Sequence, residues 1–300
     1  MRKLIYFCFI SFGLLLSSIA SAKTSLDGIV VFGDSLSDNG NLYKMKQGKV
    51  LGAPYYLGRC SNGLVWVEIL TKELHFSSKQ LDDRAIAGAQ TSGSHPPGAI
   101  QQINRYIDEN PQLDPNKLYI LWIGGNNYLY HPFGRTHRVN KTIGDINKAI
   151  TLLAKHGAHY ILVPNLPDIG ANPLAAKLQQ KRPHLGLKAN LTQLSLKHNE
   201  KLEKDLPALQ QKLGPNVDIL LMNDYALMET VEVDPSKYGI KNLHDACYNG
   251  PKLFQGGGTV CKDPNQYLFW DAVHPTFTGH EALAGLALQT LKNAGVVTSH

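Results

Sequence analysis

Short runs of apolar residues recur along the chain, separated by longer stretches whose apolar positions lie three or four residues apart. Four such runs occupy residues 28–32, 118–123, 160–163 and 217–222, and none of them alternates with polar residues. A strand that is buried on both faces gives a continuous apolar run, whereas a half-exposed strand alternates. The runs therefore predict four strands of a sheet that is covered on both sides.

The stretches between these runs have the periodicity of helices. The positions that share one helix face are Ile100, Ile103, Tyr106 and Ile107 in one stretch and Ile143, Ile146, Ile150 and Leu153 in another. Residues 187–213 predict one long helix or two shorter ones, and a capping box at Thr278 and Glu281 predicts the start of a last helix. Alternating strands and helices predict an α/β fold, a three-layer α/β/α sandwich with a mainly parallel sheet.

The first residues do not follow this pattern. Arg2 and Lys3 precede an uncharged apolar stretch at 4–19, and Ala20-Ser21-Ala22 has the small residues of a cleavage site. These three parts predict a secretory signal peptide, residues 1–22, and the apolar stretch is short for a membrane anchor. We expect the remaining residues, 23–300, to form a single domain that is exported to the periplasm or secreted, without a stable transmembrane anchor.

Charge and cysteine content narrow the class of protein. The formal net charge is +6, and it becomes +4 when the two basic residues of the signal peptide are removed. No basic block with interleaved aromatic residues occurs, so we expect no nucleic-acid partner.

Export permits a disulfide. Cys247 and Cys261 lie close together in residues 242–267, which resemble a long irregular loop, and they are the expected pair, with Cys60 left as a free thiol.

Candidate catalytic residues lie near both ends of the predicted domain. Ser35 follows the first predicted strand, and active sites of this architecture lie beyond the carboxyl ends of strands. Near the other end, Asp271 precedes His274 by three residues. A serine hydroxyl needs a base within hydrogen-bond reach, and the base needs an orienting partner. Each segment alone is also typical of an ordinary turn, but together they predict Ser35, His274 and Asp271 as nucleophile, base and acid.

Hydrolysis of an ester also requires hydrogen-bond donors for the oxyanion. The backbone amide of Ser35 is one candidate. Gly88 follows a short segment at 84–86, and Asn126 follows the strand at 118–123, so both could supply a donor at the same sheet edge, although glycine turns are common. Asp34, next to the serine, is expected to bind backbone in the turn rather than to act as the triad acid.

These segments together resemble the GDSL, or SGNH, hydrolases. Residues 32–38, Phe-Gly-Asp-Ser-Leu-Ser-Asp, are similar to the first block of the family, and the later blocks are matched at Gly88, at Asn126 and at residues 271–274, in the family's order. The resemblance implies that Ser35 is the nucleophile, Gly88 and Asn126 are oxyanion donors, and Asp271 and His274 are acid and base. One departure is Asn127, where the family often has Asp.

Residues 39–41 and 61–68 resemble one branch of this family more closely, that of bacterial secreted lysophospholipases, lipases and glycerophospholipid:cholesterol acyltransferases. The resemblance implies a lipid acyl ester as substrate, such as a lysophospholipid at a membrane or micelle surface, with acyl transfer as a further activity and no metal or organic cofactor. The alternatives are a carbohydrate acetylesterase and an inactive exported lipid-binding protein. The predicted disulfide precedes Asp271, so we expect it to hold a wall or lid of the site.

Overall fold

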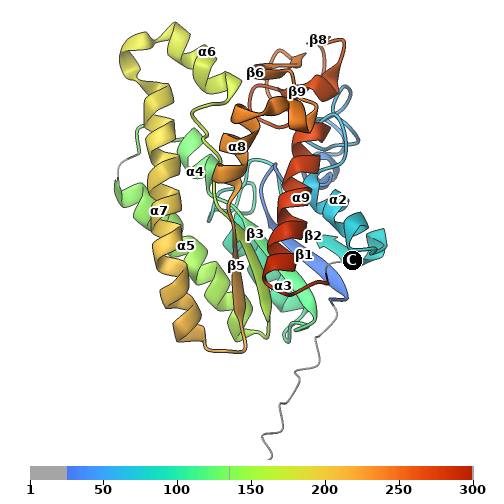
Figure 1. Cartoon of the computed structure of the whole chain (residues 1–300), viewed down its shortest axis with the longest axis vertical. Coiled ribbons are helices and arrows are strands. Elements are labelled where there is room, and N and C mark those ends of the chain that lie inside the picture. The colour runs from blue at the N-terminus through green and yellow to red at the C-terminus, as the bar shows by residue number, and fades with distance from the viewer. Residues whose placement is uncertain (1–25, 135, 299–300) are drawn as a thin grey trace, which may run out of the picture.

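The structure, a computed structural model, describes residues 26–134 and 136–298 of the chain. The predicted signal peptide, residues 1–22, lies outside the described residues. Within the described part of the chain, no helix is long and apolar enough to cross a membrane. A central sheet runs through the molecule, with helices on both of its faces (Figure 1).

The central sheet has five strands in the order β2-β1-β3-β4-β5, and all neighbouring strands are parallel. The strands are β1 (Gly28–Gly33), β2 (Leu81–Asp83), β3 (Lys117–Trp122), β4 (Tyr160–Pro164) and β5 (Asp218–Met222). The prediction of a mainly parallel sheet is confirmed, and each of the four apolar runs forms a strand. β2 lies just before the short segment at 84–86. Its apolar signal is weak because this short edge strand is only half-buried and contains two aspartates.

Helices cover the two faces in separate groups. One face carries α3 (Ala99–Glu109), α5 (Thr136–Lys155) and α7 (Leu187–Leu213), and the other carries α2 (Trp66–Glu73) and α9 (Phe277–Asn293). Successive side chains of a strand point to opposite faces. Val30 and Phe32 of β1 therefore pack with the first group, and Ile29 and Val31 pack with the second. The prediction of a three-layer sandwich is confirmed.

The last helix begins two residues earlier than the sequence predicts. Its N-cap is Thr276, whose hydroxyl accepts a hydrogen bond from the Gly279 N–H at 3.4 Å. The predicted capping box at Thr278 and Glu281 is therefore wrong, and the Thr278 hydroxyl donates to a loop carbonyl instead. The physical reason is that the backbone N–H of Thr276 is already bonded to the strand that precedes it, at Leu268, which fixes this residue at the helix entrance.

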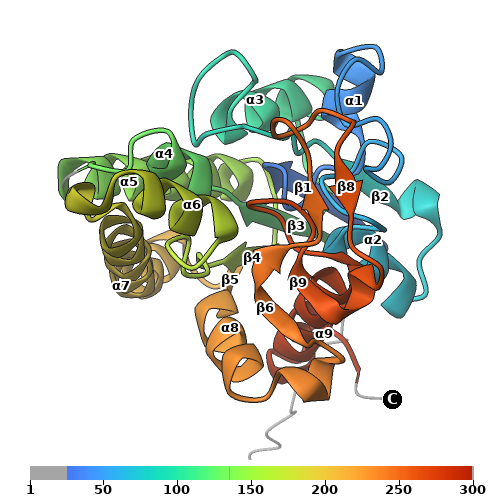
Figure 2. The same cartoon turned by 90° about the horizontal axis from the view of Figure 1, so that it is seen from above.

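Shorter elements gather at the carboxyl edge of the sheet, which Figure 2 shows from above. They are α1 (Asn41–Met45), α4 (Gly125–Leu129), α6 (Pro173–Lys181) and α8 (Asp224–Val233), with the 3-10 turns η2 (Pro183–Leu185), η3 (Pro235–Tyr238) and η4 (Pro264–Gln266). A further 3-10 turn, η1 (Ser78–Gln80), lies at the opposite edge, directly before β2. Helices α4, α6 and α8 follow β3, β4 and β5 in turn, so they surround the edge at which the candidate residues were predicted.

Residues 242–267 are more regular than the loop that the sequence indicates. β6 (Asn242–Ala246) pairs in parallel with β9 (Tyr267–Phe269), and β7 (Tyr248–Asn249) pairs with β8 (Thr259–Val260) in antiparallel fashion. The prediction of an irregular loop is wrong at these strands because all four are short, and β6, β7 and β8 contain no continuous apolar run. β6, β8 and β9 lie together above the central sheet (Figure 1).

Candidate active site

Ser35 lies in the turn that leaves β1, and it is only 6% exposed. The last residue of β1, Gly33, has no room for a side chain, because an added Cβ would lie 2.6 Å from the carbonyl oxygen of Trp122 in β3. The backbone N–H and C=O of Gly33 both bond to the side chain of Gln102 in α3, at 2.9 Å each. These contacts fix the end of the strand and hence the start of the turn that carries Ser35.

The structure brings Ser35 together with Asp271 and His274, although 239 residues separate the serine from the histidine. His274 Nε2 lies 2.8 Å from Ser35 Oγ, and His274 Nδ1 lies 2.8 and 2.9 Å from the two carboxylate oxygens of Asp271. Burial opposes the charge of this carboxylate. The electrostatic attraction of His274 and the hydrogen bonds to Asp271 outweigh burial, so the pKa of Asp271 lies below its ordinary value. Acid, base and hydroxyl thus form one continuous hydrogen-bonded series.

Tyr55 completes the surroundings of the Asp271 carboxylate. Its hydroxyl donates to Asp271 Oδ2 at 2.8 Å, while the backbone N–H groups of Val273 and His274 donate to Oδ1, each at 2.8 Å. The same hydroxyl accepts a hydrogen bond from the Phe254 N–H at 3.2 Å. Burial and the neighbouring Asp271 raise the pKa of Tyr55, so the phenol keeps its proton at neutral pH. The carboxylate is therefore fixed from several sides.

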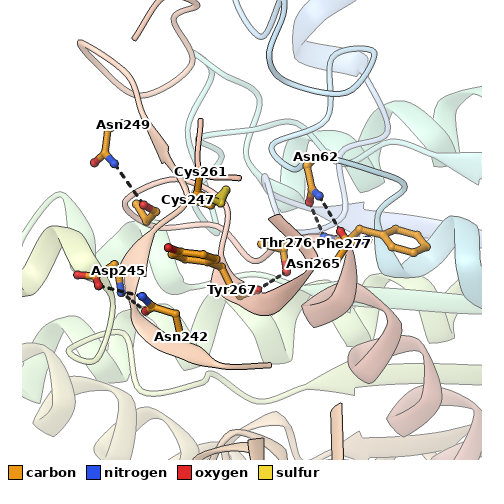
Figure 3. Close-up of a disulfide and its surroundings, with 11 residues drawn as sticks. Asn62, Asn242, Asp245, Cys247, Asn249, Cys261, Asn265, Tyr267, Thr276 and Phe277 are labelled. Atoms are coloured by element: carbon orange, nitrogen blue, oxygen red, sulfur yellow. Dashed lines mark hydrogen bonds between the residues drawn. A yellow bond between two sulfur atoms is a disulfide. The ribbon is translucent and has the colours of Figure 1, made fainter. Parts of the chain in front are cut away.

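The chain just after the histidine is held by residues 61–63. Ser61 Oγ donates to the Pro275 carbonyl at 3.0 Å, and Asn62 Oδ1 accepts from the Phe277 N–H at 2.7 Å (Figure 3). Gly63 packs so closely on Phe277 that an added Cβ would lie 2.7 Å from its ring. A segment far away in sequence thus sets the path of the chain between the base and α9.

Gly88 lies in the turn after β2 with a φ of 83°, a left-handed conformation that favours glycine. Among residues 26–134 and 136–298, no acceptor binds the backbone N–H of Gly88 or that of Ser35. The buried Asp38 carboxylate ties this turn to the serine segment, since it accepts from the Ala87 N–H at 2.7 Å and from the Gly40 N–H at 2.8 Å. Two backbone donors are therefore available for an anion.

Asn126 and Asn127 lie in α4, shortly after β3. Asn126 Nδ2 donates to the Ala89 carbonyl at 3.0 Å and to Asp34 Oδ2 at 3.2 Å. Asn127 exchanges two hydrogen bonds with Thr91: its Oδ1 accepts from the backbone N–H at 3.0 Å, and its Nδ2 donates to the hydroxyl at 2.9 Å. A carboxylate at position 127 could not make the second bond as a donor. Asn127, where the family often has Asp, therefore links α4 to the segment after Gly88.

Asp34 binds the turn and the candidate oxyanion donor. Its Oδ1 accepts from the Leu36 N–H at 3.2 Å, and its Oδ2 accepts from Asn126. Burial raises the pKa of Asp34 to about 6. The backbone contact agrees with the turn-forming role expected from the sequence, whereas the contact with Asn126, 92 residues away, has no signal in the sequence.

A cavity of about 530 Å³ opens beside Ser35 and His274. Its apolar wall comes from segments that follow β4 and from α8, β9 and their neighbours, and it includes Leu166, Ile169, Leu227, Val231, Ile240 and Leu268. Binding sites for small molecules are commonly apolar with a few placed polar groups. A second cleft, of about 670 Å³, lies between α6 and residues 244–261 and reaches Tyr55 and Asp271.

The structure joins Cys247 and Cys261 by a disulfide across β7 and β8 (Figure 3). Cys60 is a buried free thiol. Two aromatic contacts connect this region with the hydrogen-bonded series. Tyr248 stacks on Trp270, which precedes Asp271 directly, with ring centroids 5.5 Å apart. Inside the bridged loop, Phe254 lies 5.7 Å from the His274 ring, centroid to centroid. The bridged loop therefore forms a wall next to the base.

Three residues that the sequence does not single out, Tyr55, Asp38 and Gln102, hold the candidate site from three sides. A tyrosine in a loop carries no signature, and no spacing rule relates residue 55 to residue 271. Asp38 stands within the block that resembles the family, but the sequence alone assigns no role to it. Gln102 is a polar residue on the apolar face of the helix predicted from Ile100 and Ile103. This position is the one signal in the sequence that Gln102 is buried and needs a hydrogen-bond partner.

Several known proteins are similar to this chain. The model of the GDSL-like Lipase/Acylhydrolase family matches residues 29–286. A phosphatidylcholine-sterol acyltransferase of Aeromonas hydrophila is 27% identical, over 93% of this chain and 94% of that protein. A GDSL esterase/lipase of Arabidopsis thaliana is 24% identical, over 92% and 91%. The crystal structure of a member of the lipolytic protein G-D-S-L family from Veillonella parvula superposes with a TM-score of 0.49 at 16% identity, covering 87% of this chain and 96% of that one.

Proposed function

Because the chain belongs to the family of GDSL-like lipases and acylhydrolases, we propose that it is an exported serine esterase that hydrolyses lipid acyl esters. The observation that carries the proposal is the hydrogen-bonded series from Ser35 Oγ through His274 to Asp271, which lies beside an apolar cavity. In this proposal residues 1–22 direct export, and residues 23–300 form the hydrolase domain.

His274 is the general base. Its Nε2 takes the proton of Ser35 as Oγ attacks the acyl carbonyl, and a tetrahedral intermediate forms. Asp271 holds the imidazole and stabilises its positive charge. The proton on Nε2 then passes to the leaving alcohol, and the acyl group stays on Ser35. Water, activated by the same base, attacks this acyl-enzyme and releases the acid. Another alcohol in the place of water gives acyl transfer.

The oxyanion of the intermediate is stabilised by the backbone amides of Ser35 and Gly88 and by the side chain of Asn126. The two backbone N–H groups are free of acceptors in the described residues, which supports this role. Asn126 Nδ2 already bonds to Asp34 at 3.2 Å. We expect this longer bond to be exchanged for a bond to the oxyanion, while the bond to the Ala89 carbonyl keeps the amide oriented.

The apolar cavity favours a lipid acyl ester over an acetyl ester of a carbohydrate, because an acetyl group would leave most of the apolar wall unfilled. Burial of apolar surface contributes roughly 25 cal/mol per Å². The Aeromonas hydrophila relative is named for phosphatidylcholine and sterol, which supports a phospholipid-derived ester. We propose lysophospholipid at a membrane or micelle surface as the substrate, with transfer to an acceptor alcohol as a second activity.

Two measurements test this function. The purified protein is assayed for the release of fatty acid from lysophospholipid and of acetate from acetylated sugars, with the Ser35→Ala variant as control. Labelling with a serine-directed fluorophosphonate reports the reactive hydroxyl independently of the substrate. We expect labelling and lysophospholipid hydrolysis that both depend on Ser35. Preference for the acetylated sugar would support a carbohydrate acetylesterase, and absence of labelling would support an inactive lipid-binding protein.

A further inference from the structure

A buried carboxyl group without a partner lies in the apolar cavity. Asp224 is the first residue of α8, is 1% exposed, and contributes to the lining of the cavity beside Ser35. Its Oδ1 has no hydrogen-bond partner among the residues that the structure describes. Buried polar side chains nearly always have partners. The unpartnered oxygen belongs to a residue that lines the binding cavity, so a group of the ligand can supply the missing partner.

Asp224 and Ser35 lie at the same edge of the sheet, Asp224 beyond the outermost strand β5 and Ser35 beyond the interior strand β1. Ser35 is two residues beyond the end of β1, and Asp224 is two residues beyond the end of β5. β3 and β4 lie between these two strands. Since neighbouring strands are 4.7–4.9 Å apart, three steps across the sheet separate the two residues by on the order of 14 Å. A ligand that reaches both residues must extend along the cavity.

Other buried or half-buried polar groups of this cavity are already occupied. Asp168 accepts from the Gly170 N–H at 2.8 Å and from the Thr192 hydroxyl at 3.0 Å, and Asn172 accepts from the Ala175 N–H at 2.8 Å. Asp224 differs from them in having no such contact. Burial raises its pKa to about 7, so near neutral pH both the acid and its anion are populated. Either form accepts a hydrogen bond from a hydroxyl group.

We propose that Asp224 recognises a hydroxyl group on the acyl chain of the substrate, near the end remote from the ester carbonyl. The inference rests on the proposed function, since it places the acyl chain in the cavity beside Ser35. A plain hydrocarbon chain leaves the carboxyl unpartnered, and a buried polar group without a partner is destabilising. A hydroxylated chain donates its O–H to the Asp224 carboxyl group. The cavity therefore selects hydroxylated chains over plain chains of the same length.

The test compares p-nitrophenyl esters of laurate with a series of hydroxylaurates whose hydroxyl moves along the chain. The acetate ester is the third substrate, because it reports Ser35 chemistry without reaching Asp224. We expect the wild-type protein to prefer a hydroxylaurate whose hydroxyl lies near the chain end. In Asp224→Leu the ratio of kcat/KM for that ester to kcat/KM for laurate should fall about tenfold, equivalent to about 1.4 kcal/mol. Acetate hydrolysis should be retained.

Two further variants keep the outcome decisive. Asp224→Asn preserves size and a hydrogen-bonding oxygen, so it should keep part of the preference, and it serves if the leucine variant does not fold. Glu229→Gln removes one charge from the exposed side of α8 and should leave the ratio unchanged. A folded Asp224→Leu protein with an unchanged ratio, or a wild type without preference, would overturn the inference alone. A wild type inactive on all esters, acetate included, would overturn the proposed function as well.

Discussion

Ser35 stands at the end of a strand in the middle of the sheet, whereas Asp271 and His274 stand on a connection between the short strand β9 and α9. The serine turn follows β1, which pairs with β2 and β3, and Gln102 from the adjacent helix closes the strand end. The acid and base depend on side chains from residues 55–62 and on a disulfide-bridged loop. Backbone pairing thus positions the nucleophile, and distant side chains position the acid–base pair.

Removal of the nucleophile gives the largest expected effect. Ser35→Ala deletes one hydroxyl and leaves every backbone contact of the β1 turn in place. We expect ester hydrolysis to fall by on the order of 10⁴–10⁶-fold, as for other members of such triads, with no change in secretion or thermal stability. Steady-state assays and circular dichroism check both parts. Near-normal turnover by a folded Ser35→Ala protein would refute the assignment of the nucleophile.

The second largest effect concerns the two buried aspartates of the site, Asp271 next to His274 and Asp34 next to Ser35. Asp271→Asn removes the charge that orients and stabilises the His274 imidazole, so we expect turnover to fall by about 10⁴-fold in a folded protein. Asp34→Asn should lower turnover less, because Asp34 contacts backbone and Asn126. Parallel kcat measurements on the two variants decide the ranking. The reverse order would show that the acid has been assigned to the wrong aspartate.

The same comparison explains how far the sequence predicts the molecule. β1 and β3 are continuous apolar runs, and Ser35 and Asn126 follow them within two and four residues, so the strand pattern together with the sequence motifs leads to these positions. β6 is short and mostly polar, and the sequence predicts a loop there, whereas β9 is apolar but only three residues long. Contacts such as Tyr55 with Asp271, 216 residues apart, depend on tertiary packing that no local pattern encodes.

Substitution of Asn126, which follows β3, should have a smaller effect on turnover. Asn126→Ala removes a donor whose bond to the substrate oxygen strengthens in the transition state, so we expect kcat to fall by roughly 10²–10³-fold with little change in KM. The matched control is Asn127→Ala, which removes the contacts with Thr91 and should lower the melting temperature more than kcat. An effect of Asn126→Ala on KM alone would assign this residue to ground-state binding.

Tyr55→Phe tests whether a distant side chain positions the acid, Asp271. It deletes one donor to the Asp271 carboxylate and leaves the two backbone donors in place. Hydrogen bonds to charged groups contribute about 1.5–3 kcal/mol, so we expect kcat to fall by about tenfold while KM changes little. Tyr56→Phe, at the exposed neighbouring tyrosine, should have no effect. Equal effects of the two variants would show that Tyr55 does not position the acid.

The disulfide gives the smallest expected effect, because it acts on the base only through the packing of its loop. Cys247 and Cys261 are 14 residues apart, and closure of such a loop stabilises by about 3 kcal/mol in chain-entropy models. The bridged loop carries Phe254, which lies against His274. In Cys247→Ser/Cys261→Ser we therefore expect altered kinetics toward lysophospholipid, whereas hydrolysis of a short soluble ester and the global fold should change less.

Peptide mapping of the unreduced protein checks the pairing first, and Cys247 should be linked to Cys261 with Cys60 free. Lysophospholipid and p-nitrophenyl acetate are then assayed with the double variant and with the wild type. The contrast between substrates matters, because a loop that only staples the fold would alter both activities in proportion to lost stability, whereas a wall of the active site alters the long-chain substrate alone. A disulfide that includes Cys60 would overturn the pairing. Unchanged kinetics on both esters would show that the disulfide does not influence Asp271 and His274.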